Sequence, residues 1–341
     1  MTTPLPAPPA AHALPVPAPL PPDATEGGLA FHRLVFARRR SGWWTPLVVG
    51  IVGVAFYVAM LIVVMIAIIA VALAVPDAAE RLMSLGTEIA FDMTDPWVNL
   101  LLLGTIALML PSYWLASLLI NGRRVGLVSS AAGRLRWRWM LLCTGVAAVI
   151  AVASSALGLL LPAEAGEVVP PTENPQVWAT LIVLLLVVPL QATAEEYIFR
   201  GYLQQAVGRW LRHPAFAILL PVPLFVLGHL YDPLGQISVG VFAVAAGWLT
   251  WRTGGLEAAI ALHVVNNLLA FLMGLAGWSD VNESSPGWAS LIFSFVLIGA
   301  YTGAVELIWR RRQLPRTLLL TPPVPPVGAA PVMPPSAARH P

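Results

Sequence analysis

The sequence predicts an all-α protein, a polytopic membrane bundle of about eight transmembrane helices. Hydrophobic residues make up 58% of the 341 residues and charged residues only 11%, and the mean hydropathy is +0.78. Soluble domains contain about 45–50% apolar and about 25% charged residues, so an ordinary water-soluble enzyme is excluded. The single cysteine, Cys143, lies in an apolar run, which excludes an intrachain disulfide and a cysteine-based metal cluster.

Eight apolar runs account for most of the chain, and a helix needs about 20 apolar residues to cross the bilayer. The fifth and sixth runs are short. Tryptophans lie at or near many of the run ends, as is typical of side chains at the membrane–water interface. We predict the spans at residues 46–75, 97–120, 140–161, 177–207, 214–231, 236–252, 256–276 and 288–309.

Proline-rich segments flank this bundle, which we place at residues 42–312. Residues 1–41 are predicted to be a disordered N-terminal tail, and residues 313–341 a disordered C-terminal tail. Repeated prolines prevent a regular helix and favour extended, partly polyproline-like chain.

Arginine placement predicts the orientation of the bundle. All 19 basic residues are arginines, and they cluster before the first span and after the second, fourth, sixth and eighth. The intervening loops carry aspartates and glutamates, with Arg81 as their one arginine. Because positive charge favours the cytoplasmic side, we expect both termini in the cytoplasm and an even number of spans.

Polar side chains interrupt three of the predicted spans. A charge at the bilayer centre costs at least about 2.5–3.5 kcal/mol, so such residues need one another, a water-filled cavity or a metal. The residues are Glu195, Glu196 and Arg200 in the fourth span, His229 in the fifth, and His263 and Asn267 in the seventh. If the fourth and fifth spans turn near Arg212, Glu195 and His229 lie at one depth, since each is 17 residues from the turn.

Two further pairs have helical spacing. Glu196 and Arg200 are four residues apart with the acid first, which favours an ion pair, and His263 and Asn267 share one helix face. Each pair also has a purely structural interpretation, as an ion pair within one helix or as hydrogen bonds between helices. Their shared depth favours a functional site over separate structural contacts.

The residue types in this cluster are those of a hydrolase. Glu195 is a candidate general base for water, with an imidazole to hold the water, and His263 and Asn267 are candidate donors to an oxyanion. Glu195, His229 and His263 are also a ligand set that zinc accepts at a catalytic site with an open position. The chain has neither an HExxH helix nor a Gly-x-Ser-x-Gly elbow.

The combination of these motifs resembles the CPBP family of intramembrane proteases. The resemblance rests on three motifs, which occur in the family's order and on separate predicted spans: Glu195-Glu196-x-x-x-Arg200, Phe225-x-x-x-His229 and His263-x-x-x-Asn267. That family includes the CAAX prenyl endopeptidases and bacterial bacteriocin-processing or immunity (Abi-type) proteins. The resemblance covers about residues 177–276, which we expect to be the protease-like core.

The resemblance implies a role for each matching residue. Glu195 would activate water with the assistance of His229, and Glu196 would be held by Arg200. The pair His263 and Asn267 would polarise the scissile carbonyl or steady its oxyanion. The family's description as metalloproteases and a metal-free, glutamate-driven mechanism both remain open.

We therefore expect an intramembrane endopeptidase whose polar cavity opens towards the cytoplasm and whose partners are the lipid bilayer and a membrane-associated peptide or protein, with no nucleic acid. A prenylated CAAX substrate is one option. The lysine-free composition rich in Ala, Pro and Arg is typical of a high-GC bacterial product, so the bacterial cell membrane is the expected location and prenylated substrates would be unusual.

Two alternatives stay open. One is a proton-coupled transporter with the polar residues as a relay, which broken helices and internal repeats would favour. The other is a non-catalytic membrane scaffold or immunity protein, which the intact motifs make less attractive.

Overall fold

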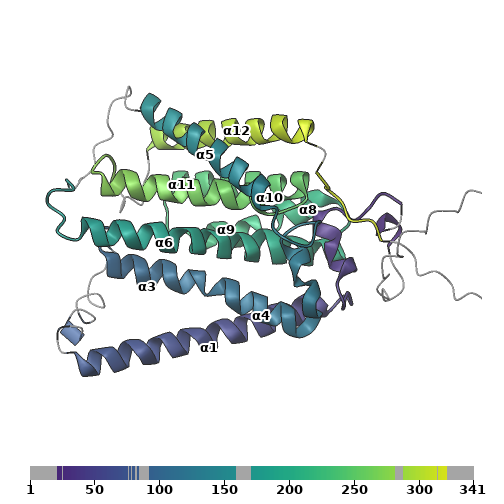
Figure 1. Cartoon of the computed structure of the whole chain (residues 1–341), viewed down its shortest axis with the longest axis horizontal. Coiled ribbons are helices and arrows are strands. Elements are labelled where there is room, and N and C mark those ends of the chain that lie inside the picture. Colours follow the sequence, from purple (N-terminus) through teal and green to yellow (C-terminus); the bar gives the residue numbers. More distant parts are fainter. Residues whose placement is uncertain are drawn as a thin grey trace, which may run out of the picture.

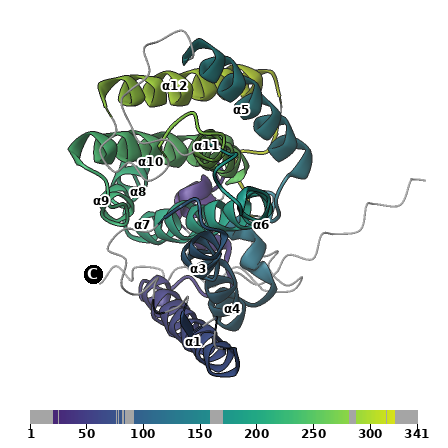
Figure 2. The same cartoon turned by 90° about the vertical axis from the view of Figure 1, so that its left-hand side faces the viewer.

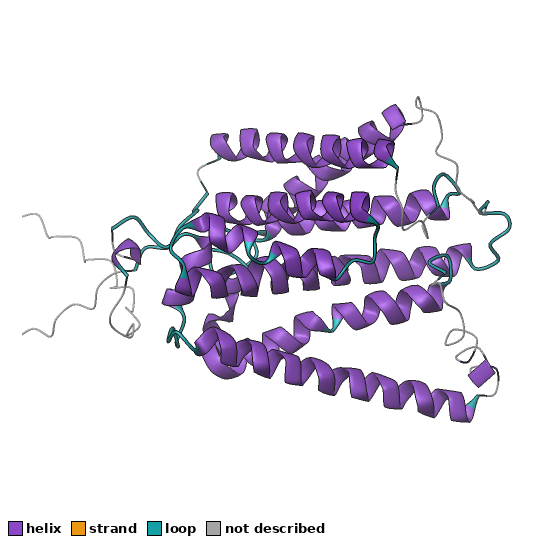
Figure 3. Cartoon of the chain, turned by 180° about the vertical axis from the view of Figure 1, so that it is seen from behind, coloured by secondary structure: helices purple, strands orange, loops and turns teal. Residues whose placement is uncertain are grey.

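The structure, a computed structural model, describes residues 21–24, 26–75, 77, 79–80, 83, 92–158, 170–280, 287–312 and 314–320. These residues form a helical bundle with two isolated β-bridges and no β-strand (Figure 3). Within them, seven helical stretches are long and apolar enough to cross a membrane. The predicted all-α membrane bundle is confirmed. The stretches are α1 (Thr45–Ala74), α3 and α4 (Pro96–Ala107 and Met109–Asn121), α5 (Trp137–Gly158), α6 (Val177–Glu196) with η4 (Tyr197–Leu203) and α7 (Gln204–Trp210), α10 (Pro233–Thr253), α11 (Glu257–Leu275) and α12 (Trp288–Arg311).

The fifth predicted span differs from a full transmembrane helix. It consists of α8 (Pro214–Leu219) and α9 (Val222–Leu227), which together are shorter than the other spans. Pro221 separates the two helices because proline has no N–H to donate and clashes with the preceding turn. Both short helices pack against α10, so the run still contributes to the bundle.

Both ends of the described chain lie at the same end of the bundle (Figure 1). Leu29 and Leu318 exchange two backbone hydrogen bonds of 2.8 and 3.0 Å. Arg124 donates to the Ala37 carbonyl here, and Arg136 donates to the Pro315 carbonyl. We call this the arginine-rich end. The described chain thus begins and ends on one side of the bundle, and the even number of passes stays a prediction.

Part of the predicted N-terminal tail is folded. All seven residues of the 3₁₀-helical turn η2 (Phe31–Ala37) are buried. The Arg33 guanidinium donates to the Gly208 carbonyl at 2.8 Å and forms an ion pair with Asp23 at 3.0 Å. A Cβ on Gly208 would collide with the His32 carbonyl oxygen, so only glycine allows this close packing. The structure thus differs from the prediction of disorder through residue 41, while residues 1–20 and 321–341 lie outside the described residues.

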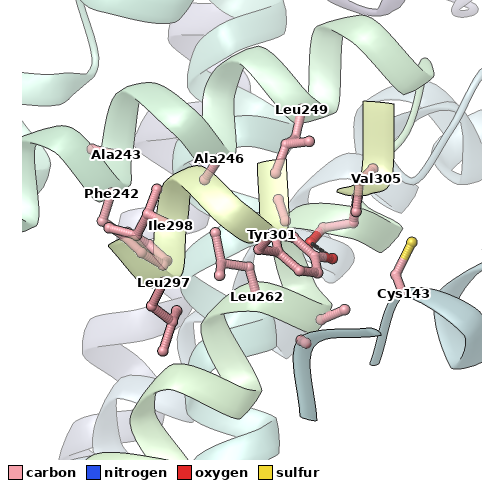
Figure 4. Close-up of a cluster of buried hydrophobic side chains, with 14 of the residues drawn as sticks. Cys143, Phe242, Ala243, Ala246, Leu249, Leu262, Leu297, Ile298, Tyr301 and Val305 are labelled. Atoms are coloured by element: carbon pink, nitrogen blue, oxygen red, sulfur yellow. Dashed lines mark hydrogen bonds between the residues drawn. The ribbon is translucent and has the colours of Figure 1, made fainter. Parts of the chain in front are cut away.

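The largest hydrophobic cluster joins α5, α10, α11 and α12 (Figure 4). Tyr301 is fully buried and donates its hydroxyl to the Ala258 carbonyl at 2.8 Å. Leu262 and Ile298 lie close to the Tyr301 ring, with Leu249 on the α10 side. This packing holds α11 in the interior, where it presents its polar face to α6.

The helix α1 lies at the edge of the bundle (Figure 2). Its buried residues are confined to its first turns, Thr45, Pro46, Val49 and Gly53. It packs mainly on α4, and most of its length is left to lipid.

Candidate active site

Helix α6 continues without interruption through the π-helical turn η4 into α7. Glu195 and Glu196 are the last two residues of α6, and Arg200 lies in the π-helical turn. Such turns are rare and are frequent at functional sites. Here the turn begins directly after the two glutamates and contains Arg200, the ion-pair partner of Glu196.

Glu196 is the most enclosed acid of the cluster. It is 0% exposed, and its Oε1 accepts from Arg200 Nη1 and from His263 Nδ1, both at 2.8 Å. Its Oε2 is buried without a hydrogen-bond partner among the described residues. A buried carboxylate is tolerated only when it is paired and hydrogen-bonded, and Glu196 obtains both from residues of two different helices.

Aromatic rings enclose the arginine. The Arg200 guanidinium carbon lies 4.3 Å from the ring centre of Phe225 and 5.6 Å from that of Phe242. The negative face of an aromatic ring attracts a cation, and more strongly away from water. Phe242 also contacts His263 edge-on, with ring centres 4.9 Å apart. These rings therefore fix both partners of Glu196.

Glu195 faces the other nitrogen of the same histidine. Its Oε2 lies 3.6 Å from His263 Nε2 and has no hydrogen-bond partner among the described residues. The side chains of Glu195 and His263 are 9% and 3% exposed. A separation of 3.6 Å is too long for a direct hydrogen bond but fits two groups that share one water. His263 thus lies between two carboxylates, bonded to Glu196 and separated from Glu195 by a short gap.

Asn267 lies one helical turn beyond His263 and also faces α6. Its Nδ2 donates to Gln191 Oε1 at 3.2 Å, and its Oδ1 accepts from Asn266 Nδ2 at 3.3 Å. Gln191 is four residues before Glu195, so α6 and α11 meet through two matching pairs one turn apart. Gln191 was not among the residues predicted from the sequence. Its signal was a lone amide in an apolar run, at helical spacing from Glu195.

His229 lies just after α9, at the margin of the cluster. Its Nδ1 is 2.8 Å from the Phe225 carbonyl oxygen, and its ring lies 4.7 Å from the Phe225 ring. The Phe225 ring also lies 6.1 Å from the His263 ring, so it stands between the two imidazoles. All six residues singled out in the sequence therefore gather in one region: four are in direct contact or within 3.6 Å, and His229 and Asn267 flank them.

The sequence also predicts Glu195, His229 and His263 as possible zinc ligands. Among the described residues, no group of three or more His, Cys, Asp or Glu side chains is placed so that it could hold a metal ion. Nδ1 of His263 is engaged by Glu196, and Nδ1 of His229 faces a backbone carbonyl. The set Glu195, His229 and His263 stays a prediction from the sequence, and no step below is routed through a metal.

Comparison with known proteins shows a family resemblance over the same segment. Residues 176–269 match the family described as type II CAAX prenyl endopeptidase Rce1-like. The chain is 25% identical over 244 residues to the uncharacterized protein YyaK of Bacillus subtilis (strain 168), an alignment that covers 65% of this chain and 78% of that protein. No solved structure gives a significant match. The resemblance that the motifs predicted is confirmed, and the matching segment contains all six residues.

Proposed function

With an Rce1-like segment at residues 176–269 as the premise, we propose that this chain is an intramembrane endopeptidase in which Glu195 activates the attacking water. The main support is the position of His263. Its Nδ1 lies 2.8 Å from Glu196 Oε1, and its Nε2 lies 3.6 Å from Glu195 Oε2. The carboxylate of Glu195 is unpartnered and little exposed, which suits a group that must accept a proton from a water in an apolar site.

The proposed chemistry begins with one water that lies beside Glu195 Oε2 and His263 Nε2 and bonds to both. His263 donates a hydrogen bond from its Nδ1–H to Glu196, so Nε2 carries no hydrogen and accepts one hydrogen bond from that water. Glu195 takes the other proton as the water oxygen bonds to the scissile carbonyl carbon. It then returns this proton to the departing amide nitrogen as the C–N bond breaks. Glu196 and Arg200 act as positioning residues, because they hold the histidine and touch neither water nor substrate.

The carbonyl oxygen becomes negative in this step and needs donors. Asn267 Nδ2 has two N–H groups, and the Gln191 carbonyl oxygen takes one of them. The second is available to the oxyanion, one helical turn from the water site. His229 assists from the margin, where its ring is held through Nδ1 and packs on Phe225.

The substrate we propose is a membrane-associated peptide or protein. Glu195 and Glu196 lie in the helical stretch Val177–Trp210, which is apolar enough to cross a membrane. A scissile bond must therefore reach the carboxylates from within or beside the bilayer. The same position makes bulk water scarce and increases the strength of each hydrogen bond to the reacting atoms.

The test is a comparison of wild-type chain with Glu195→Gln, which keeps the shape of the side chain and removes the base. New peptide ends in membranes of an expressing host are measured by mass spectrometry, so that the substrate need not be known. We expect wild-type chain to generate ends that the variant forms about 10²–10⁴-fold more slowly. The control is Glu306→Gln, which changes an acid on α12 that pairs with Arg252 outside the cluster. Equal cleavage by wild type and Glu195→Gln would remove Glu195 as the base, and no new ends from the wild type would remove the function.

A further inference from the structure

A second polar pocket lies at the arginine-rich end, where α1 begins, α4 ends and α7 follows the π-helical turn. It is a small pocket that is open to solvent. Its polar lining consists of Arg38, Arg40, Thr45, Asn121, Tyr202 and Gln205. We call this the α1 pocket.

The α1 pocket is separate from the candidate active site, although both include residues of the continuous helical stretch Val177–Trp210, which we call the helical rod. Glu196 and Arg200 face α11, α9 and α10. Tyr202, in contrast, donates its hydroxyl to the Pro46 carbonyl in α1 at 2.8 Å. The two sites therefore lie on different faces of the rod, and the inference below does not depend on the proposed peptidase activity.

The pocket holds positive charge without a counter-charge. Arg38 is 4% exposed, and its guanidinium donates only to neutral oxygens, the Tyr113 hydroxyl and the Gln205 side-chain carbonyl. Its Nε has no partner among the described residues. None of the residues that line the pocket is acidic, although Arg40 adds a second cation. A buried guanidinium without an anion is costly, so the arrangement lacks a negative ligand.

The start of α1 adds to this field. The helix has 30 residues and begins at Thr45, and no side chain caps its N-terminus. Such a terminus carries partial positive charge, which favours a bound phosphate or carboxylate, although the Thr45 N–H donates to the Gly42 carbonyl and Pro46 has no N–H. Thr45 is 2% exposed, and its Oγ1 is buried without a partner. Arg38 Nε and Thr45 Oγ1 are thus two unused donors in one pocket.

The surroundings are those of a membrane interface. Trp43 and Trp44, directly before α1, are 64% and 44% exposed, and such rings concentrate at the depth of lipid headgroups. Beyond the pocket, α1 exposes apolar side chains such as Ile51, Val54 and Val58. A basic pocket therefore lies next to interfacial tryptophans and an exposed apolar helix. A ligand with a charged head and long acyl chains fits these neighbouring surfaces better than a free anion does.

We propose that the α1 pocket binds the phosphate headgroup of an anionic phospholipid, whose acyl chains lie along α1. Basic pockets between transmembrane helices are a recurrent way to bind such headgroups. Arg38 and Thr45 donate to the phosphate oxygens from the buried side, and Arg40 closes the pocket from the solvent side. The bound lipid joins the outer helix α1 to the rod that carries Glu195 and Glu196.

The experiment uses the purified full chain in detergent. Binding of phosphatidylglycerol is titrated by native mass spectrometry, with phosphatidylcholine and inorganic phosphate as separate arms. Arg40→Gln is compared with Arg39→Gln, because both side chains are exposed neighbours and only Arg40 lines the pocket. We expect Arg40→Gln to weaken phosphatidylglycerol binding about fivefold, the usual effect of one basic residue beside an anionic membrane, and Arg39→Gln to leave it unchanged.

Thr45→Val provides a second variant on the buried side and should also weaken binding, and the thermal midpoint of each lipid-free variant verifies folding. Several results would overturn the proposal. Equal losses in Arg40→Gln and Arg39→Gln would indicate general surface charge. If phosphatidylcholine binds as tightly as phosphatidylglycerol, the pocket does not need an anion. If inorganic phosphate binds as tightly, the ligand is a free anion rather than a lipid.

Discussion

The helices α1 and α11 can both cross a membrane, yet the structure places them in opposite environments. In the most apolar stretch of α1 no residue is buried, whereas 44% of the corresponding stretch of α11 is buried. In Figure 1, α1 diverges from its neighbours, while α11 lies between α5, α6, α10 and α12. The more apolar helix is thus the outer one, which is the reverse of a water-soluble protein.

The difference follows from what each helix must bury. Between residues 46 and 74, α1 has no charged residue, so lipid solvates it without cost. Helix α11 begins with Glu257, which pairs with Arg136 at 2.7 Å, and continues with His263, which bonds to Glu196. Polar groups find no partners in hydrocarbon and must be enclosed by protein. In this bundle, polar side chains decide which helices are central.

The largest expected effect comes from breaking the pair at the centre of the bundle. Glu196→Gln leaves Arg200 buried without its counter-ion, and such a change costs about 3–5 kcal/mol. The free energy of unfolding in mixed micelles, measured by titration with sodium dodecyl sulfate, is the readout. The control is Glu306→Gln near the end of α12, where Glu306 pairs with Arg252 and with the exposed Arg310, and each ion pair near the surface contributes at most about 1 kcal/mol. Equal losses would mean that burial does not distinguish the two pairs.

A smaller effect is expected on the amide face of α11. If Asn267 donates to the oxyanion, Asn267→Ala lowers kcat about 10²–10³-fold, as the loss of one such donor does elsewhere, with little change in KM. The neighbouring Asn266→Ala removes only a side chain that donates to Asn267 and should reduce kcat far less. Peptide-end formation in membranes measures both. A similar kcat for the two variants would argue against a direct role of Asn267.

The smallest change in the free energy of unfolding is expected for a substitution on α1. The same substitution, Ile→Ala, at a buried position of α11 is the comparison. Ile62 on α1 is 54% exposed, whereas Ile260 on α11 is 4% exposed. Ile62→Ala should change the free energy of unfolding by no more than about 0.5 kcal/mol, as surface substitutions do. Ile260→Ala should cost about 2–5 kcal/mol, because it leaves a cavity. Matching values in the detergent titration would contradict the assignment of α1 to the periphery.

The fold class and the composition of the cluster could be predicted because both follow from strong, local costs. An apolar run of sufficient length has few options other than a spanning helix, and charges within it must find one another. This reasoning brought Glu195, Glu196, Arg200 and His263 together, and the structure places them in contact or near contact.

Other features depended on contacts between distant segments. The break in the fifth run follows from Pro221, but a proline in a spanning helix is often tolerated, so its outcome was not evident. The burial of Phe31–Ala37 depends on the close approach of the His32 carbonyl that Gly208 allows. The partnership of Gln191 with Asn267 also required the relative register of α6 and α11.

By itself, the sequence determined that this chain is a membrane bundle, that its two ends share a side, and that its scarce polar residues form one cluster. Hydrophobicity and charge set these features, since they act on each segment separately. Tertiary structure alone decided that His263 bonds to Glu196 and stands off from Glu195, that α1 is peripheral, and that Arg38 and Thr45 meet in a pocket. Such features depend on which faces of two helices meet, and a hydrogen bond or ion pair is sensitive to shifts far smaller than any periodicity in a sequence can specify.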